Sequence, residues 1–296
     1  MATRSPSTTV PEPRTLVFGA TGSLGRHVLN ALVARGTAPE TITAVGRNAT
    51  RLTELAEAGF GTAALDLSDS GGVREVVSNH SDIVLISGSD ANRLAQHLSV
   101  IEAAKNSNAR HVYYTSGVRA DDGQADINAD HKATEDALIA SGMTYTILRN
   151  TWYIENYIQA MAGPRYTGVL AAAVGDAVVA AASRKDLADA LATVITTDGH
   201  DNVTYSLSGD TDFTYADIAE AMSEVLGRDV TYVPVSPNQL RAQLTGAGLD
   251  DGLAGFLVSL DETIATGTFS RVGDDLSRII GRPTTGLVQG LTAEQV

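Results

Sequence analysis

The chain has 296 residues, which is enough to bury one large core or a domain with a smaller satellite. Its formal charge of −14 leaves few basic residues for the positive surface that nucleic-acid binding requires, so we expect no nucleic-acid partner. The absence of cysteine excludes disulfides and cysteine metal sites, and the six histidines lack ligand spacing, so we expect no metal site and a reducing, cytoplasmic location.

The first 13 residues are polar and contain prolines, and we expect a disordered tail here rather than a signal peptide. No run of about 18 apolar residues occurs, so we expect no membrane partner. From residue 14 onwards, short apolar runs alternate with helical patterns such as 23–36 and 49–59, each ending at a glycine that can cap it. This alternation predicts an α/β fold with a Rossmann-type, doubly wound parallel sheet. The expected strands lie at residues 14–20, 41–47, 62–67, 82–87, 110–116 and 144–150.

The pattern changes after about residue 160. Ser183 and Thr214 are the expected N-caps of two helices, and Gly227 is the expected end of the second. We therefore expect a Rossmann domain over residues 14–160 and a smaller C-terminal lobe over residues 161–296, partly interleaved with it. The lobe is expected to contain helices at 183–200 and 214–228 and strands at 203–209 and 229–236.

The segment GATGSLG runs from a strand directly into a helix, which is the context expected of a dinucleotide-binding loop. Gly19 permits the tight turn, Gly22 lets the backbone approach a pyrophosphate, and Gly25 lets the helix pack on the strand. The start of the helix also offers free N–H groups to the anion. The expected cofactor-binding residues of this loop are Gly19, Ala20, Thr21, Gly22, Ser23, Leu24 and Gly25.

The end of the second strand distinguishes NAD from NADP. A carboxylate there would bind the ribose hydroxyls of NAD, whereas an arginine suits the extra phosphate of NADP. Arg47 occupies this position and Arg51 follows one helical turn later, so the sequence favours NADPH. Asp66, after the third strand, is a candidate for an adenine contact or, equally, for a helix cap. After the fourth strand, small residues let the backbone approach the cofactor, and these are Ser87, Gly88 and Ser89.

Residues 127–142 form an amphipathic helical pattern that carries a histidine on its apolar face. Burying an imidazole costs free energy unless it is hydrogen-bonded. His131 is therefore either a core histidine bonded to the backbone, or a catalytic group that holds cofactor or acceptor and titrates near neutral pH. Both interpretations stay open at this point. The face is formed by Ile127, His131, Thr134 and Leu138.

The chain resembles the NmrA-like group of atypical short-chain dehydrogenase/reductases, and within it the bacterial NAD(P)H:quinone oxidoreductase 2 type, to which triphenylmethane-dye reductase is related. The similarity runs from about residue 14 to residue 291 and implies NADPH binding through residues 19–24, Arg47 and residues 87–89. It also implies that residues 150–161 surround the nicotinamide and the substrate. The segments that carry it are GATGSLG, YYTSG, HKATEDALIASGMTYTILRNTWYIENY and IGRPTT.

In the wider superfamily, the catalytic helix carries Tyr-x-x-x-Lys followed by a glutamate. This chain lacks that tyrosine and that lysine. Counting back from Glu135 places Ile127 and His131 at those positions, and Lys132 lies about 100° away around the helix. Reduction of a simple ketone needs a positioned acid, so simple ketones should be poor substrates. A quinone yields a phenol-like anion, with a conjugate acid of pKa about 10, and a cationic dye needs no proton at all.

Seven of the fifteen aromatic residues lie between residues 113 and 166 and could sandwich a planar acceptor. We expect Tyr145 to be the core member of this set, and Trp152 to lie with two tyrosines on the loop after the sixth strand, where α/β proteins bind ligands. The catalytic candidates are His131, Asn150 and Tyr153, and Asn156 and Tyr157 are further candidates for cofactor binding. The set comprises Tyr113, Tyr114, Tyr145, Trp152, Tyr153, Tyr157 and Tyr166.

These observations predict an NADPH-dependent oxidoreductase that transfers hydride directly to a small-molecule quinone or similar conjugated electrophile, without flavin or metal. One alternative is an NmrA-like redox sensor that binds the dinucleotide and acts through a protein partner. A further alternative is a reductase of imines, enones or cationic dyes on the same scaffold. A homo-oligomer is compatible with the sequence.

Overall fold

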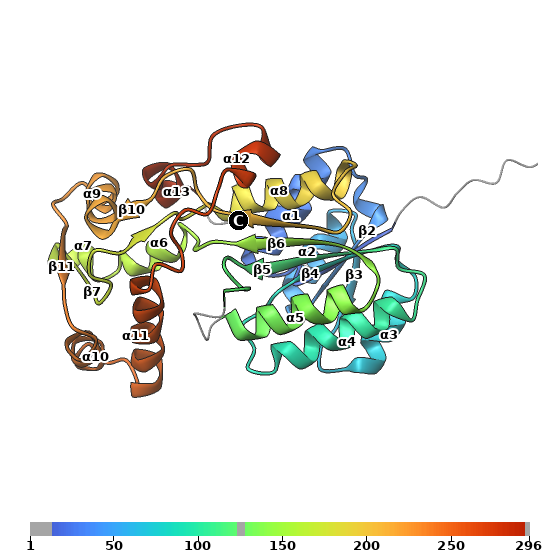
Figure 1. Ribbon diagram of the computed structural model, residues 1–296, viewed down its shortest axis with the longest axis horizontal. Coiled ribbons are helices and arrows are strands. Elements are labelled where there is room, and N and C mark those ends of the chain that lie inside the picture. Colours follow the sequence, from blue (N-terminus) through green and yellow to red (C-terminus); the bar gives the residue numbers. More distant parts are fainter. Residues whose placement is uncertain (1–13, 123–127, 294–296) are drawn as a thin grey trace, which may run out of the picture.

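The structure, a computed structural model, describes residues 14–122 and 128–293. Its centre is a seven-stranded, wholly parallel sheet of strand order β3-β2-β1-β4-β5-β6-β9 (Figure 1). The order reverses between β1 and β4, and the carboxyl ends of strands at such a switch point form a ligand crevice. The predicted doubly wound sheet is confirmed. Its strands are β1 (Thr15–Phe18), β2 (Ile42–Gly46), β3 (Gly61–Ala64), β4 (Asp82–Ile86), β5 (His111–Gly117), β6 (Thr144–Asn150) and β9 (Val203–Leu207).

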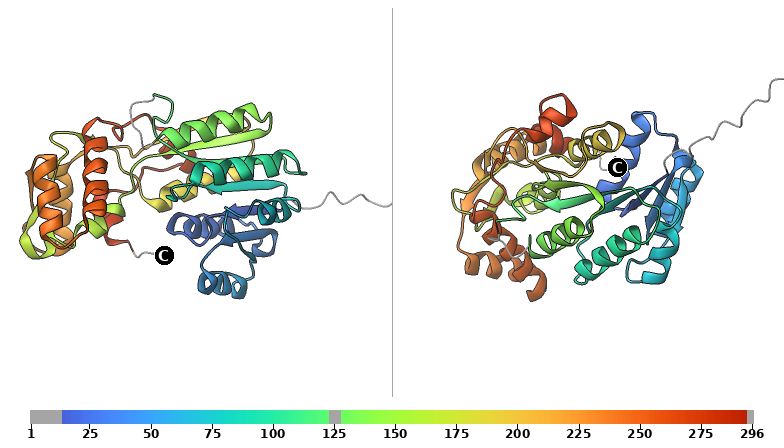
Figure 2. Two further views of the ribbon diagram at one scale, coloured as in Figure 1. Left: turned by 90° about the horizontal axis from the view of Figure 1, so that it is seen from below. Right: turned by 45° about the vertical axis from the view of Figure 1, so that its right-hand side comes forward.

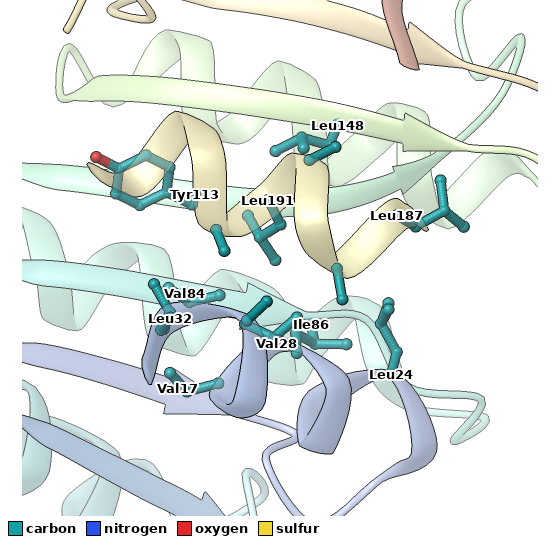
Figure 3. Close-up of a cluster of buried hydrophobic side chains, with 14 of the residues drawn as sticks. Val17, Leu24, Val28, Leu32, Val84, Ile86, Tyr113, Leu148, Leu187 and Leu191 are labelled. Carbon is teal, nitrogen blue, oxygen red and sulfur yellow. The ribbon is translucent and has the colours of Figure 1, made fainter. Parts of the chain in front are cut away.

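Helices cover both faces of the sheet, because side chains alternate along each strand (Figure 2). Val17 and Leu148 face one helical layer, whereas their neighbours Leu16 and Ile147 face the other. Figure 3 shows the first layer, where leucines of two helices meet the sheet. That layer contains α1 (Ser23–Ala34), α2 (Ala49–Glu57) and α8 (Arg184–Thr196), and the opposite layer contains α3 (Ser70–Val77), α4 (Arg93–Lys105) and α5 (Ala129–Ala140).

Local signals determine most helix ends. The Asn48 side chain accepts the Arg51 N–H at the start of α2, and Ser183 accepts the Asp186 N–H at the start of α8. Gly36 and Gly59 have φ of +93° after α1 and α2, a backbone conformation that favours glycine. The caps expected at Ser183 and at these two helix ends are therefore confirmed, whereas Ile127 lies outside the described residues.

The smaller lobe contains two short two-stranded sheets and their own hydrophobic core (Figure 1). Helix α9 in this lobe begins with the expected Thr214 capping box, and it ends at Gly227 with φ +64°. The remaining elements of the described chain are η1 (Pro39–Thr41), α6 (Asn156–Ala160), α7 (Pro164–Thr167), β7 (Val169–Ala172), β8 (Val178–Val179), β10 (Phe213–Thr214), α9 (Tyr215–Leu226), β11 (Thr231–Pro234), α10 (Pro237–Gly246), α11 (Asp251–Ala265), α12 (Asp275–Ile280) and α13 (Leu287–Thr292).

The chain crosses between the central sheet and the smaller lobe more than once within residues 161–293. Strand β9 pairs in parallel with β6, with Thr146 opposite Val203, and α8 packs on α1. Helix α12 then returns from the lobe and packs on α8 and β9. Residues 184–207 therefore belong to the central sheet and its layers, because they bury their apolar residues there.

The described chain consists of residues 14–122 and 128–293. Neither range contains a helix that is both long and apolar enough to cross a membrane. The same ranges contain no group of three or more histidine, aspartate or glutamate side chains arranged to hold a metal ion.

Candidate active site

The glycine loop lies at the carboxyl end of β1, beside the switch point of the sheet. Gly19 has φ +78°, and a Cβ atom on Gly25 would overlap the Gly19 carbonyl oxygen and the Ala20 backbone. Helix α1 begins after Gly22, which has no side chain to cap it, and Gly22 N donates to Gly19 O over 3.0 Å. The first N–H groups of α1, from Ser23 onwards, therefore point to a place where an anion can bind.

A basic corner adjoins this loop at the end of β2 and consists of Arg26, Arg47 and Arg51. Arg47 is 62% exposed and lies 3.1 Å from Asp90 and 3.8 Å from Asp66. Burial and the neighbouring Arg51 guanidinium lower the pKa of Arg26. Arg26 Nε is buried and has no hydrogen-bond partner among the described residues. Cations held close together in this way favour a bound anion, and the sequence analysis missed Arg26, although it stands immediately after the glycine loop.

The other cofactor candidates have local roles in the structure. Asp66 Oδ1 accepts the Ser68 N–H over 2.8 Å, and this bond, more than the Arg47 charge, lowers the pKa of Asp66. Ser87 N donates to Thr115 Oγ1 over 2.9 Å, which holds the segment 87–89 at the carboxyl end of β4. A Cβ atom on Gly88 would meet nothing within 4 Å, so this backbone is open to an approaching ligand. Contact of these residues with the cofactor stays a prediction.

Glu135 of α5 and Arg149 of β6 form a buried ion pair. Arg149 Nε and Nη2 donate to the two carboxylate oxygens of Glu135 over 2.9 and 2.6 Å, and Glu135 is 2% exposed. Ser116 Oγ donates to the same carboxylate, and Arg149 Nη1 also contacts Asp121 at 2.7 Å. Burial disfavours the Arg149 charge, but these carboxylates outweigh it and raise the pKa of Arg149. The network fixes α5 against β5 and β6.

His131 lies on α5 with its Nδ1 atom 2.7 Å from the Tyr114 hydroxyl. Burial, with the nearby Arg93 charge, lowers the pKa of His131 to about 3. The imidazole is therefore neutral near pH 7 and is no cationic proton donor. Its ring lies beside Gly117, where an added Cβ atom would come within 3.2 Å of Cδ2. Lys132 forms an exposed ion pair with Asp136, so its predicted rotation away from this face is confirmed.

The segment after β6 is held by the start of α8. The Arg184 guanidinium lies 4.7 Å above the Tyr153 ring, and its Nη2 donates to Asn156 Oδ1 over 2.9 Å. Arg184 N donates to Glu155 Oε1 over 2.8 Å. Burial raises the pKa of Tyr153, while a side-chain hydrogen bond with Asn150 lowers it. The candidates Asn150, Tyr153 and Asn156 therefore lie together, and Arg184 is a neighbour that the sequence analysis did not identify.

The aromatic residues divide differently from the expectation. Tyr145 is only partly buried, whereas Tyr113 and Tyr114 are buried on opposite faces of the sheet. The prediction of Tyr145 as the core member is therefore wrong. Tyr145 is the second residue of β6 and packs only partly buried against the hydrophobic cluster of the α3–α5 layer. Tyr157 is 4% exposed in the lobe core, with its ring edge on Tyr215. Of the seven, Tyr166 is 81% exposed and lines no cluster.

A cavity of about 380 Å³ lies between helix α1, the N-terminal half of α8 and helix α13. Its lining brings Ser23 of the glycine loop together with Glu155 and Arg184. Glu155 is 8% exposed, and its Oε2 atom lies 3.9 Å from the guanidinium of Arg184. Ser23 at the start of α1 and Glu155 after β6 therefore line one cavity, which otherwise runs along α1, α8 and α13.

Several buried polar atoms among the described residues have no hydrogen-bond partner. Native proteins pair nearly all such atoms, so each of these calls for a partner such as a ligand or a water. One belongs to the first turn of α1, and the others follow β5 or β6. Among the described residues these atoms are Arg26 Nε, Arg119 Nε, Thr151 Oγ1, Trp152 Nε1, Glu155 Oε2 and the Tyr157 hydroxyl.

Residues 19–198, which contain the loop, the basic corner and the segment after β6, match the family described as NAD(P)H-binding. The chain belongs to that family. It is 35% identical over 277 residues to quinone oxidoreductase 2 of Escherichia coli (strain K12), which covers 93% of this chain and 96% of that protein.

Solved structures agree with this assignment. The NADPH-dependent quinone oxidoreductase QOR2 complexed with NADPH from Escherichia coli matches with a TM-score of 0.89 at 34% identity, covering 94% of this chain and 98% of that one. The Citrobacter sp. triphenylmethane reductase complexed with NADP(H) matches with a TM-score of 0.88 at 29% identity and the same coverage. The predicted family, the Rossmann-type fold and the class of NAD(P)H-dependent oxidoreductase are confirmed.

Proposed function

We propose that the protein transfers a hydride from NADPH to a quinone or a similar conjugated acceptor. The observation that carries this proposal is the state of His131, which occupies the position of the lysine in the wider superfamily and is partly buried and neutral. The described part of the site offers no cationic acid there, so the reduced acceptor must tolerate a negative charge. A hydroquinone anion does so because its charge is delocalised, whereas the alkoxide from a simple ketone does not.

The reaction balances without a further cofactor. The nicotinamide of NADPH supplies two electrons and one proton as hydride, and one proton from water completes the hydroquinone. Asn150 and Tyr153 can hold the acceptor or the carboxamide, because they lie at the carboxyl end of β6 with Arg184 behind them. Positioning of this kind is the main contribution that the protein can make to hydride transfer.

NADPH rather than NADH is supported by the basic corner. Arg47 and Arg51 follow β2, where the extra phosphate of NADPH is bound in Rossmann folds, and the Arg51 charge also acts on Arg26 of α1. We expect Arg47→Ala to weaken NADPH binding about tenfold, corresponding to one charge-assisted hydrogen bond, and to leave NADH binding nearly unchanged. Equal losses for both cofactors in a fluorescence titration would contradict the assignment. Arg35→Ala, at the far end of α1, is the matched control.

Oxidation of NADPH with menadione tests the function, with acetone as the simple ketone. We expect turnover with menadione alone, and a large loss of turnover in Asn150→Ala with NADPH affinity kept. Tight NADPH binding without turnover on menadione or other conjugated acceptors would favour the redox-sensor alternative. Efficient reduction of acetone would refute the argument from His131.

A further inference from the structure

Arg119 has an unusual backbone and an incompletely bonded side chain. It follows β5 and has φ +57°, in the left-handed region that side chains other than glycine and asparagine rarely adopt. The turn is closed by a bond from Ala120 N to Gly117 O over 3.2 Å. Such strain is retained where a side chain must point in one direction, and it gathers at functional sites.

The Arg119 side chain reaches from the central sheet to the lobe. Its Nη2 atom donates to Ser270 Oγ over 2.9 Å, in the segment after α11. Its Nε atom is buried and has no acceptor among the described residues. The bond to Ser270 pairs the Nη2 atom of the guanidinium, and the Nε–H group has no acceptor among the described residues.

Trp152 presents a second donor to the same segment. It follows β6, and its ring centre lies 5.2 Å from that of Phe269, the residue before Ser270. Trp152 Nε1 is also buried without an acceptor in the described part of the chain. Arg119 follows β5 and Trp152 follows β6, and these two strands are adjacent in the sheet. At their ends, Val118 N donates to Asn150 O over 2.9 Å. The side chains of Arg119 and Trp152, each with one unpaired N–H group, therefore both contact residues 269–270 from neighbouring strand ends.

The chemistry of these groups defines the ligand that they can bind. Arginine and tryptophan side chains donate hydrogen bonds and accept none, and a buried donor without an acceptor costs free energy. We propose that Arg119 and Trp152 form the acceptor side of the active site and bind one oxygen of the quinone. This inference rests on the proposed function and extends it. The guanidinium stabilises the oxygen anion that remains after hydride transfer, which compensates for the missing proton donor on α5.

This arrangement selects among acceptors. A quinone oxygen accepts both N–H groups and gains negative charge during reduction, so Arg119 favours its reaction. A cationic triphenylmethane dye has no such oxygen and is repelled by the guanidinium. We therefore expect a preference for quinones over cationic dyes that depends on Arg119.

Turnover tests the role of each donor. Arg119→Gly removes the side chain and relieves the backbone strain, and Trp152→Phe removes the N–H group while keeping the ring on Phe269. We expect each variant to lose about 10-fold or more in kcat/KM for menadione, as for a hydrogen bond to a charged group, with NADPH affinity unchanged. The ratio of menadione to crystal violet turnover should fall in Arg119→Gly. Asn202→Gly is the control, because Asn202 also has φ +57° but lies before β9, at the opposite end of the sheet.

Binding is tested without turnover, because Trp152 is the sole tryptophan of the chain. With NADP⁺ bound, menadione is not reduced, and we expect it to quench Trp152 fluorescence with saturation. The dissociation constant should rise about 10-fold in Arg119→Gly and stay unchanged in Asn202→Gly.

The outcomes separate the two proposals. Menadione reduction with unchanged Trp152 fluorescence, or with wild-type kinetics in both variants, would overturn the inference and leave the proposed function intact. Saturable quenching that depends on Arg119 but without turnover would support the binding site and refute the proposed function. Neither quenching nor turnover would refute both.

Discussion

The substitution His131→Asn tests whether the histidine of α5 is a neutral structural group. Burial lowers the pKa of His131 to about 3, against about 6.5 in the unfolded chain. Between these values the unfolded state binds a proton that the folded state does not bind. Stability is therefore highest above about pH 6.5 and falls as the pH decreases toward 3.

The magnitude follows from the two pKa values. At about pH 5 this one histidine should cost about 2 kcal/mol of stability relative to about pH 7.5. Asparagine can keep a hydrogen bond to the Tyr114 hydroxyl but does not titrate. We expect the variant to be about 1 kcal/mol less stable than the wild type near pH 7.5. Because only the wild type loses about 2 kcal/mol through this titration, the variant should be about 1 kcal/mol more stable than the wild type at about pH 5.

Denaturant unfolding at several pH values measures this difference, and the rate of quinone reduction is followed in parallel. His97→Asn is a useful companion, because burial lowers the pKa of His97 to about 4 and it should show a similar trend. A stability difference that does not change with pH would refute the reasoning. So would a wild-type kcat profile with an ionisation near pH 6.5 that disappears in His131→Asn, since it would show proton transfer by this imidazole.

Three further substitutions probe the scaffold of the site. Glu135→Gln should lower the free energy of unfolding by about 3 kcal/mol, because it leaves Arg149 buried with only the exposed Asp121 as a carboxylate partner, and a cost below about 1 kcal/mol in urea unfolding would contradict this. Gly25→Ala should abolish NADPH binding or folding, since its Cβ would overlap the loop backbone, and wild-type affinity by fluorescence would show that the overlap is relieved. Lys132→Ala should leave turnover unchanged and alter the free energy of unfolding by no more than about 0.5 kcal/mol, and a large loss of kcat would assign Lys132 a catalytic role.

The sequence alone determined the features that depend on neighbouring residues. The alternation of apolar runs and helical patterns predicted six strands of the sheet in their order along the chain, and GATGSLG predicted the nucleotide loop. The caps at Ser183 and Thr214 were predictable for the same reason, because each involves residues three positions apart. The candidates Asn150, Tyr153 and Asn156 came together because they lie on one short segment after one strand.

Only the tertiary structure decided the features that depend on distant segments. The pairing of β6 with β9 joins residues 57 positions apart, and no local pattern shows that α8 and β9 return to the central sheet. The neutral state of His131 depends on its burial and on the nearby charge of Arg93 from another helix, α4. Arg119 and Trp152 likewise contact residues 269–270, more than 100 positions further along the chain. Folding brings these segments together, and no local sequence pattern predicts the contact.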